Sequence, residues 1–245
     1  MTTLLAVNNV RKSFGALQAI RDISFSVETG EVVGLAGPNG SGKSTLFNVL
    51  TRIPFGPDSG EVSLNGESLI GLSARQIVGR GLVRIFQTET DFETLTVLEN
   101  VIVALPHAES RLGRPARNAR ALELLRYFGI AAEKDRPAGQ ITVFSRKKLM
   151  IATALACRPK LLLLDEPGAG LSKPEVKEMT NLIRRINADG ISIIVIEHII
   201  SLLVSVSHRL IVLNFGEVLA SGKPEDVVRD PQVVEAYLGS AGDNG

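Results

Sequence analysis

Residues 37–45 read Gly37-Pro38-Asn39-Gly40-Ser41-Gly42-Lys43-Ser44-Thr45, and this stretch decides the fold of the chain. It matches the phosphate-binding loop pattern G-x-x-x-x-G-K-[S/T] at every fixed position. An apolar run over 31–36 predicts a strand before the loop, and the spacing of Leu46, Phe47 and Leu50 predicts a helix after it. Strand, glycine loop and helix form the context that the motif requires, so we predict that the loop binds nucleotide phosphates.

The loop residues have distinct expected roles. Backbone N–H groups are expected to curl around phosphate oxygens, and the start of the helix adds a partial positive charge. Lys43 is expected to reach the outer phosphates, and the Ser44 hydroxyl to hold magnesium. The alternative is an ordinary glycine-rich turn, which the flanking strand and helix disfavour.

The composition is that of an ordinary folded protein. Hydrophobic residues make up 44% and charged residues 22% of 245 residues, enough for one large or two small domains. The formal net charge of +1 gives no reason to expect nucleic acid as a partner. The single cysteine, Cys157, cannot form an internal disulfide, which suits a reducing compartment. No membrane-spanning run or signal peptide is visible, so we expect any membrane role to come through a partner.

Strand patterns alternate with helical ones along most of the chain, which predicts a doubly wound, mostly parallel sheet. We expect several short strands over 4–36, and Asn65-Gly66 predicts a hairpin turn. The remaining expected elements are buried strands at 82–86, 161–164 and 193–196, a closing hairpin over 209–219 and a final helix from about 224 to 237. Residues 88 to about 160 lack strand alternation. The capping box Thr96–Glu99 and the helical spacing of Ala121, Leu124, Leu125 and Phe128 predict a helical insertion there.

Polar side chains follow two of the predicted buried strands, where ligands of parallel sheets bind. Asp165 is placed to touch a magnesium shell, and Glu166, pointing the other way in an extended chain, could polarise a water for attack on a terminal phosphoryl group. His198 ends the next strand. The alternative for the two carboxylates is an ordinary loop. By its own pattern, Phe14 fits a core position better than a functional one, and Gln87 has no strong local interpretation.

The order and spacing of the phosphate loop, Gln87, 161–167 and His198 resemble those of the ATP-binding cassette (ABC) ATPases over essentially the whole chain. Within them, the segments 81–87, 168–172, 196–198 and 235–239 look most like the ATP-binding subunits of bacterial branched-chain amino-acid importers. The resemblance implies one ABC ATPase domain over 1–245. Its fold would be α/β, of the P-loop NTPase type, with a mostly parallel central sheet, an antiparallel β subdomain and a helical subdomain inserted at about 88–160.

The resemblance also implies ATP and Mg²⁺ as cofactors and a role for each matching residue. Phe14 would stack on adenine, and Asn39 to Thr45 would cradle the phosphates. Ser44, Gln87 and Asp165 would bind magnesium. Glu166 would be the catalytic base, His198 would contact the terminal phosphate, and Gln87 would also sense the membrane subunit.

The implied partners are integral-membrane permease subunits, docked near residues 88–100, a second ABC ATPase subunit and, indirectly, an extracytoplasmic solute-binding protein. The implied location is the cytoplasmic face of the inner membrane. Transport selectivity belongs to the permease and the binding protein, so the substrate stays open among branched-chain amino acids and related small polar solutes.

The signature segment that such ATPases offer to a partner's ATP is altered here. The corresponding residues are 141–145, in which Thr142 keeps a hydroxyl but both glycines are replaced. We expect the ring of Phe144 to obstruct the approach to phosphate or to displace the helix start. A heterodimer with a second, intact ATPase is therefore favoured over a homodimer. The alternatives are a weakly active regulatory partner in such a pair and a soluble ABC ATPase outside transport.

Overall fold

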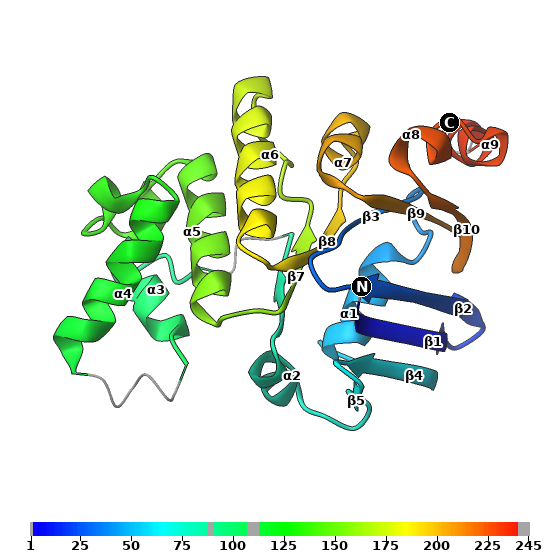
Figure 1. Cartoon of the computed structure of the whole chain (residues 1–245), viewed down its shortest axis with the longest axis horizontal. Coiled ribbons are helices and arrows are strands. Elements are labelled where there is room, and N and C mark those ends of the chain that lie inside the picture. Colours follow the sequence, from blue (N-terminus) through cyan, green and yellow to red (C-terminus); the bar gives the residue numbers. More distant parts are fainter. Residues whose placement is uncertain (1, 88–90, 107–112, 240–245) are drawn as a thin grey trace.

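The structure, a computed structural model, describes residues 2–87, 91–106 and 113–239. Within these residues a ten-stranded sheet has the order β5-β4-β1-β2-β10-β9-β3-β8-β7-β6 (Figure 1). Its strands are β1 (Thr3–Phe14), β2 (Leu17–Glu28), β3 (Val32–Ala36), β4 (Ser59–Leu64), β5 (Glu67–Ser68), β6 (Leu82–Ile85), β7 (Leu161–Asp165), β8 (Ser192–Ile196), β9 (Arg209–Asn214) and β10 (Glu217–Gly222). The helices that pack on the sheet are α1 (Lys43–Thr51), α2 (Ala74–Arg80), α5 (Val143–Ala156), α6 (Lys173–Ala188) and α7 (Ile200–Val206).

Five neighbouring strands, β9, β3, β8, β7 and β6, form the parallel part of the sheet. Every residue of β7 is buried, as is expected for a parallel strand covered on both faces. Leu162 and Leu164 pack with residues of α5, α6 and α7, whereas Leu161 and Leu163 pack with residues of α1 and α2. The predicted mostly parallel α/β fold is confirmed.

The antiparallel part of the sheet is built by β1, β2, β4 and β5. The expectation of several short strands over 4–36 is wrong, because β1 and β2 are twelve residues each and pair along their length. Their register shifts repeatedly, and such irregularities interrupt the alternation by which a long strand is recognised. Asn65 and Gly66 form the predicted hairpin turn, with φ of 51° and 76°.

Three helices lie at one end of the molecule: α3 (Val97–Ala104), α4 (Arg114–Tyr127) and α5 (Figure 1). The predicted capping box begins α3: Glu99 N–H donates to Thr96 Oγ1 at 3.2 Å, and Thr96 N–H donates to Glu99 Oε2 at 2.9 Å. Buried residues of all three helices belong to one core. We propose that they form the predicted helical insertion, of which residues 88–90 and 107–112 lie outside the described part of the chain.

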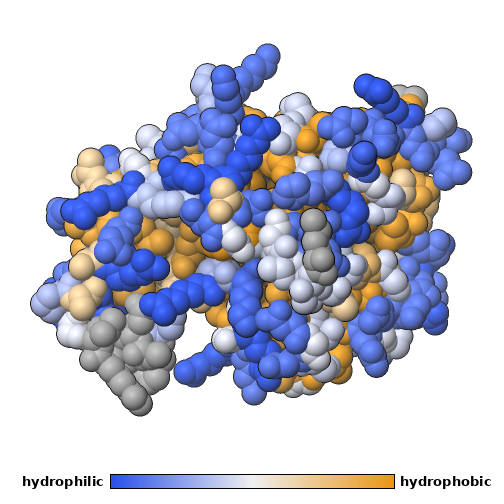
Figure 2. Space-filling view, viewed as in Figure 1, coloured by the Kyte–Doolittle hydropathy of each residue, from blue (hydrophilic) through white to orange (hydrophobic). Residues whose placement is uncertain are grey.

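The C-terminal part contains the predicted hairpin, β9–β10, and two helices in place of the single expected one. These are α8 (Pro224–Val227) and α9 (Pro231–Gly239). Pro231 is the first residue of α9, a position where its fixed φ suits the helix and its missing N–H would have no partner within the helix. Figure 2 shows hydrophilic side chains over much of one face of the molecule, with apolar ones among them. Among the described residues, no helix is both long and apolar enough to cross a bilayer.

Candidate nucleotide site

The glycine loop connects β3 to α1, in the strand–loop–helix context that the sequence predicts. Gly37, Gly40 and Gly42 all have positive φ, at 145°, 77° and 106°. A Cβ atom on Gly37 would lie 2.2 Å from the carbonyl oxygen of Leu213 and 2.7 Å from Ser41 Oγ. Only glycine therefore fits at position 37, where the loop starts. A Cβ atom on Gly40 would have no neighbour within 4 Å, so this side of the loop is open.

Lys43 is buried inside this loop. Its Nζ donates hydrogen bonds to the carbonyl oxygens of Gly37 at 2.7 Å and Pro38 at 2.9 Å. Burial lowers the pKa of Lys43, and the charges of Glu166 and Asp165 oppose that shift. The ammonium group is therefore held at the base of the loop by two carbonyl groups, with which a phosphate bound there would have to compete.

A cleft of about 770 Å³ opens over the loop and brings together residues from separate elements. Its lining residues include Phe14 from β1, Asn39, Gly40, Ser41, Gly42, Lys43, Ser44 and Thr45 from the loop and α1, Gln87 after β6, Glu166 after β7 and His198 after β8. Gly37, Pro38, Thr142 and Asp165 do not line it. Phe14 is 43% exposed, so the core position that its local pattern favours is wrong. Its ring packs edge-on against Phe55, with centroids 4.9 Å apart, at the rim of the cleft.

Glu166 is held in the cleft by two polar partners. Gln87 Nε2 donates to Glu166 Oε2 at 2.7 Å, and His198 Nε2 lies 2.9 Å from Glu166 Oε1. The expected extended backbone is wrong, because Glu166 adopts φ of 50°, in the left-handed region. The turn still carries its side chain to the cleft, where the carboxylate can accept a proton from a water.

Asp165, at the end of β7, is buried and bonded to a cation. Arg84 Nη2 donates to its Oδ2 at 2.7 Å, and the side chains are only 5% and 3% exposed. Arg84 Nη1 also donates to Asn48 Oδ1 at 2.6 Å. The apolar run 82–86 is interrupted by this single arginine, which is the sequence signal that could have pointed to the pair.

The polar groups near the loop fit Mg²⁺. Asp165 Oδ1 is buried without a hydrogen-bond partner in the structure, and the hydroxyl-bearing Ser44 is exposed at the start of α1. Among the described residues, no group of three or more His, Cys, Asp or Glu side chains could hold a metal ion. Mg²⁺ is ordinarily held by one or two carboxylates together with substrate phosphates, so this sparse donor set suits it.

Sequence reasoning missed Glu197, a buried carboxylate beside His198. It is 2% exposed; Oε1 accepts a hydrogen bond from Gly168 N–H, and Oε2 accepts from His198 N–H at 3.1 Å and Ile199 N–H at 3.4 Å. Burial raises the pKa of this carboxyl, and the three backbone hydrogen bonds oppose the shift. Glu197 thus connects the turn after Glu166 to the backbone of His198. The sequence signal that could have identified Glu197 is a charged residue directly after the apolar run 193–196.

The altered signature segment begins α5. Thr142 is the N-cap, and its Oγ1 accepts from Ser145 N–H at 3.1 Å. The expected obstruction by Phe144 is wrong: its side chain is 9% exposed and packs in the core, and the centre of its ring lies 4.1 Å from Lys148 Nζ. Burying a phenyl ring is favourable, and the second helical position turns it inward. Val143, 51% exposed, is the apolar side chain that faces solvent at this helix start.

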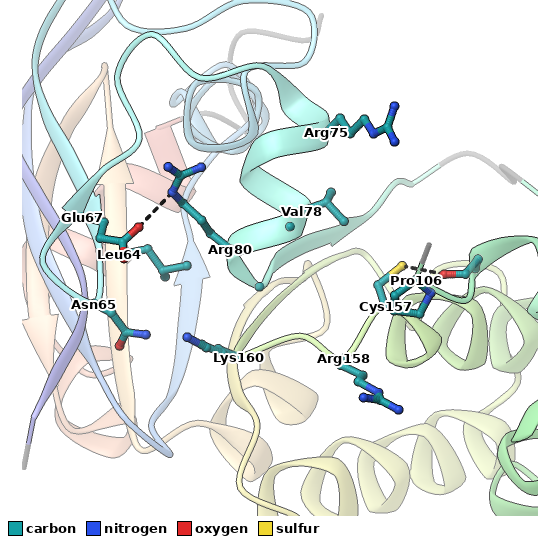
Figure 3. A pocket seen from close by; sticks show the side chains of 13 residues that line it. Leu64, Asn65, Glu67, Arg75, Val78, Arg80, Pro106, Cys157, Arg158 and Lys160 are labelled. Carbon is teal, nitrogen blue, oxygen red and sulfur yellow. Dashed lines mark hydrogen bonds and ion pairs between the residues drawn. The ribbon is translucent and has the colours of Figure 1, made fainter. Parts of the chain in front are cut away.

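A second cleft, of about 640 Å³, is lined by residues around α2 and the start of β7 (Figure 3). Its cations do not converge on a common point: Arg80 is turned to Glu67, with Nε 3.0 Å from Oε2, while Arg75 extends away from them (Figure 3). This cleft lacks the convergent donors of the glycine loop, so we assign the nucleotide to the first cleft.

Comparison with known families and proteins agrees with this geometry. The family model described as "ABC transporter" matches residues 20–169, and the one described as "Branched-chain amino acid ATP-binding cassette transporter" matches 217–243. The high-affinity branched-chain amino acid transport ATP-binding protein LivG of Salmonella typhimurium is 37% identical, over 97% of this chain and 98% of LivG. The lipopolysaccharide export system ATP-binding protein LptB of Acidithiobacillus ferridurans is 34% identical, over 98% of each chain.

Solved structures resemble the whole fold. The crystal structure of the ADP conformation of MJ1267, an ATP-binding cassette of an ABC transporter, has a TM-score of 0.87 and 30% identity, covering 98% of this chain and 100% of MJ1267. A dimeric structure of a post-hydrolysis state of the cassette MJ0796, bound to ADP and Pi, has a TM-score of 0.79 and 28% identity. The match covers 90% of this chain and 99% of the MJ0796 chain.

Proposed function

The chain belongs to the ABC transporter family of ATP-binding ATPases, and on that premise we propose that it powers an importer of branched-chain amino acids or a related small polar solute. The observation that carries the ATPase proposal is the meeting of Glu166, Gln87 and His198 over the glycine loop. A phosphate-binding loop alone would support binding; a carboxylate positioned beside it supports hydrolysis.

We propose that each residue of the cleft has a separate task. The backbone N–H groups of Asn39 to Thr45 orient the phosphates, and Phe14 stacks on adenine. Lys43 turns from the Gly37 and Pro38 carbonyls to the outer phosphates. Ser44, Gln87 and Asp165 would hold Mg²⁺, which when bound neutralises charge on the phosphates.

Glu166 takes the proton of the attacking water in this proposal, a contribution typically worth about 10²–10⁴ in rate. Gln87 and His198 orient its two oxygens, and His198 is also positioned to contact the terminal phosphate. The residue assignments are supported by proximity in one cleft and by the family to which the chain belongs.

A groove that shares Ala104 and Cys157 with the second cleft supports the docking of permease subunits. It is lined by residues of β6, α3 and α5, and Phe92 and Val103 on its rim are each 57% exposed. Exposed large apolar side chains beside a groove are typical of a site that a partner helix covers. We propose that a permease segment docks there, on the described part of 88–100. The chain would then lie on the cytoplasmic face of the inner membrane.

We propose a heterodimeric pair of ATPases. In such a pair, the ATP bound by this chain would face the intact signature segment of the second ATPase, although its own signature segment, 141–145, is altered. The dimeric MJ0796 structure supports pairing of cassettes in general. A second candidate function, a weakly active regulatory partner, is favoured by Val143 and Phe144 standing where glycines are expected.

The substrate proposal is supported by the match of 217–243 and by the similarity to LivG, whereas the similarity to LptB supports an exporter. An importer would receive its substrate through an extracytoplasmic solute-binding protein. We would purify the assembled transporter from the native operon, reconstitute it and measure phosphate release and uptake of labelled leucine.

Glu166→Gln should reduce phosphate release by about 10²–10⁴ and stop uptake while Mg-ADP binding is kept. Glu61→Gln, at an exposed position of β4, is the matched control. Full phosphate release by Glu166→Gln would refute the catalytic assignment. ATPase activity that does not respond to any amino acid, in a complex that carries lipopolysaccharide, would refute the importer.

A further inference from the structure

The last described helix touches the glycine loop directly. Gly37 N–H donates a hydrogen bond to the hydroxyl oxygen of Tyr237 on α9, at 2.7 Å and 200 positions along the chain. The same glycine offers its carbonyl oxygen to Lys43 Nζ at 2.7 Å. The first residue of the loop is therefore held on one side by α9 and on the other by the loop lysine.

Gly37 is buried at the start of the loop, and the Tyr237 hydroxyl is the acceptor that its N–H has in the structure. Its backbone, with φ of 145°, lies so close to the end of β9 that a Cβ atom built on it would be 2.2 Å from the Leu213 carbonyl oxygen. A buried N–H group that loses its acceptor costs more than an average hydrogen bond is worth. The Tyr237 hydroxyl is the acceptor that lets the loop start in this conformation.

The hydroxyl is suited to this role. Tyr237 packs against the core that also contains Val233 of α9, which is 5% exposed. Burial raises the pKa of Tyr237, and the hydrogen bond from Gly37 opposes the shift, so the hydroxyl stays neutral at working pH. Only the docked helix brings this acceptor to the loop.

We propose that Tyr237 is a positioning residue for the phosphate loop, through which the docking of α9 raises the affinity for nucleotide. The proposal rests on the nucleotide-binding role proposed for the loop. When Lys43 turns from the Gly37 carbonyl to a phosphate, Tyr237 remains as the side chain that holds Gly37. A partner that moves α9 then weakens nucleotide binding, and by linkage nucleotide strengthens the docking of α9 by the same factor.

The test is Tyr237→Phe, which keeps the ring and removes the acceptor. The matched control is Tyr127→Phe at the chain's only other tyrosine, whose hydroxyl donates to Asp189 Oδ2 at 2.6 Å. Hydrogen–deuterium exchange of the peptide 32–46, without nucleotide, should be roughly fivefold faster in Tyr237→Phe, the equivalent of about 1 kcal/mol. Tyr127→Phe should leave that exchange unchanged.

Mg-ADP affinity, measured by calorimetry, should weaken in Tyr237→Phe by up to roughly fivefold, because the bond from Tyr237 is the one that holds Gly37 once Lys43 has left its carbonyl. Mg-ADP should also slow exchange in α9 of the unmodified chain, and Tyr237→Phe should abolish that slowing. Unchanged loop exchange overturns the proposal, and so does faster exchange with unaltered Mg-ADP affinity. If the unmodified chain does not bind Mg-ADP, the proposed function fails instead, and the loop exchange still decides whether Tyr237 holds Gly37.

Discussion

Arg84 offers the sharpest test of how the site is held together. Its guanidinium, 5% exposed, donates to Asp165 Oδ2 at 2.7 Å and to Asn48 Oδ1 at 2.6 Å, and it lies 4.5 Å from the centre of the Phe86 ring. The change Arg84→Met keeps a long apolar stem in the same space and removes both donors. Asp165 then stays buried without a partner on either oxygen, since its Oδ1 has none already.

Removing one partner of a buried ion pair costs about 3–5 kcal/mol, because an uncompensated charge is left in the interior. In a chain of this size each kcal/mol lowers the melting temperature by about 2–4 °C, so Arg84→Met should lower it by roughly 6–20 °C. Replacing both members of the ion pair by apolar side chains, in the double variant Arg84→Met with Asp165→Leu, should recover most of the free energy of unfolding that Arg84→Met loses.

Equilibrium unfolding in urea, without nucleotide, measures these differences. The matched control is Arg80→Met, which breaks an exposed pair with Glu67, with side chains 34% and 67% exposed, and should cost less than about 1 kcal/mol. The reasoning is refuted if Arg84→Met costs no more than Arg80→Met, or if the double variant is as unstable as the single one.

Two further changes test the environments of single side chains. The raised pKa of Glu197 means that its contribution to stability is fully present below the ordinary value of 4.5 and is lost as the pH rises through the raised value. Because glutamine does not titrate, Glu197→Gln should be most destabilised relative to the unmodified chain at low pH. The deficit, from urea midpoints, should shrink toward neutral pH, and a constant deficit would contradict the shift. Phe144→Ala should cost about 3–5 kcal/mol because the ring is buried, whereas Val143→Ala, at an exposed position, should cost under about 1 kcal/mol. Equal losses in thermal unfolding would contradict the inward orientation of Phe144.

The parts of the fold that the sequence predicted are those with a local pattern. The all-apolar runs at 161–164 and 193–196 lie between turn signals and became buried parallel strands. The capping box at Thr96 and the Asn65-Gly66 turn each need only a few neighbouring residues to form. The glycine loop combined such a local pattern with a chemical one, which is why its place between strand and helix was predictable.

The contacts that hold the site together left no such pattern. The Arg84–Asp165 pair spans 81 positions and the Tyr237–Gly37 hydrogen bond spans 200, so neither has a period to detect. The left-handed backbone of Glu166 accompanies a hydrogen bond from its N–H to the distant Ile196 carbonyl, whereas a local rule would assign an extended conformation there. Phe144 was misjudged for the same reason: alignment with a motif says which residue replaces a glycine and leaves open which way its ring turns.

The charged groups of the cleft already have hydrogen-bond partners inside the protein, and this determines what a nucleotide must do to bind. Lys43 is bonded to two loop carbonyls, and Glu166 accepts from Gln87 and lies against His198. In the function proposed above, binding is therefore an exchange of partners, in which the ammonium group would leave carbonyl oxygens for phosphate oxygens. The net gain is smaller than the new contacts alone suggest, because the broken bonds are subtracted. Affinity then depends on how firmly the loop keeps its shape during the exchange, which makes the backbone anchors at Gly37 as important as the groups that touch phosphate.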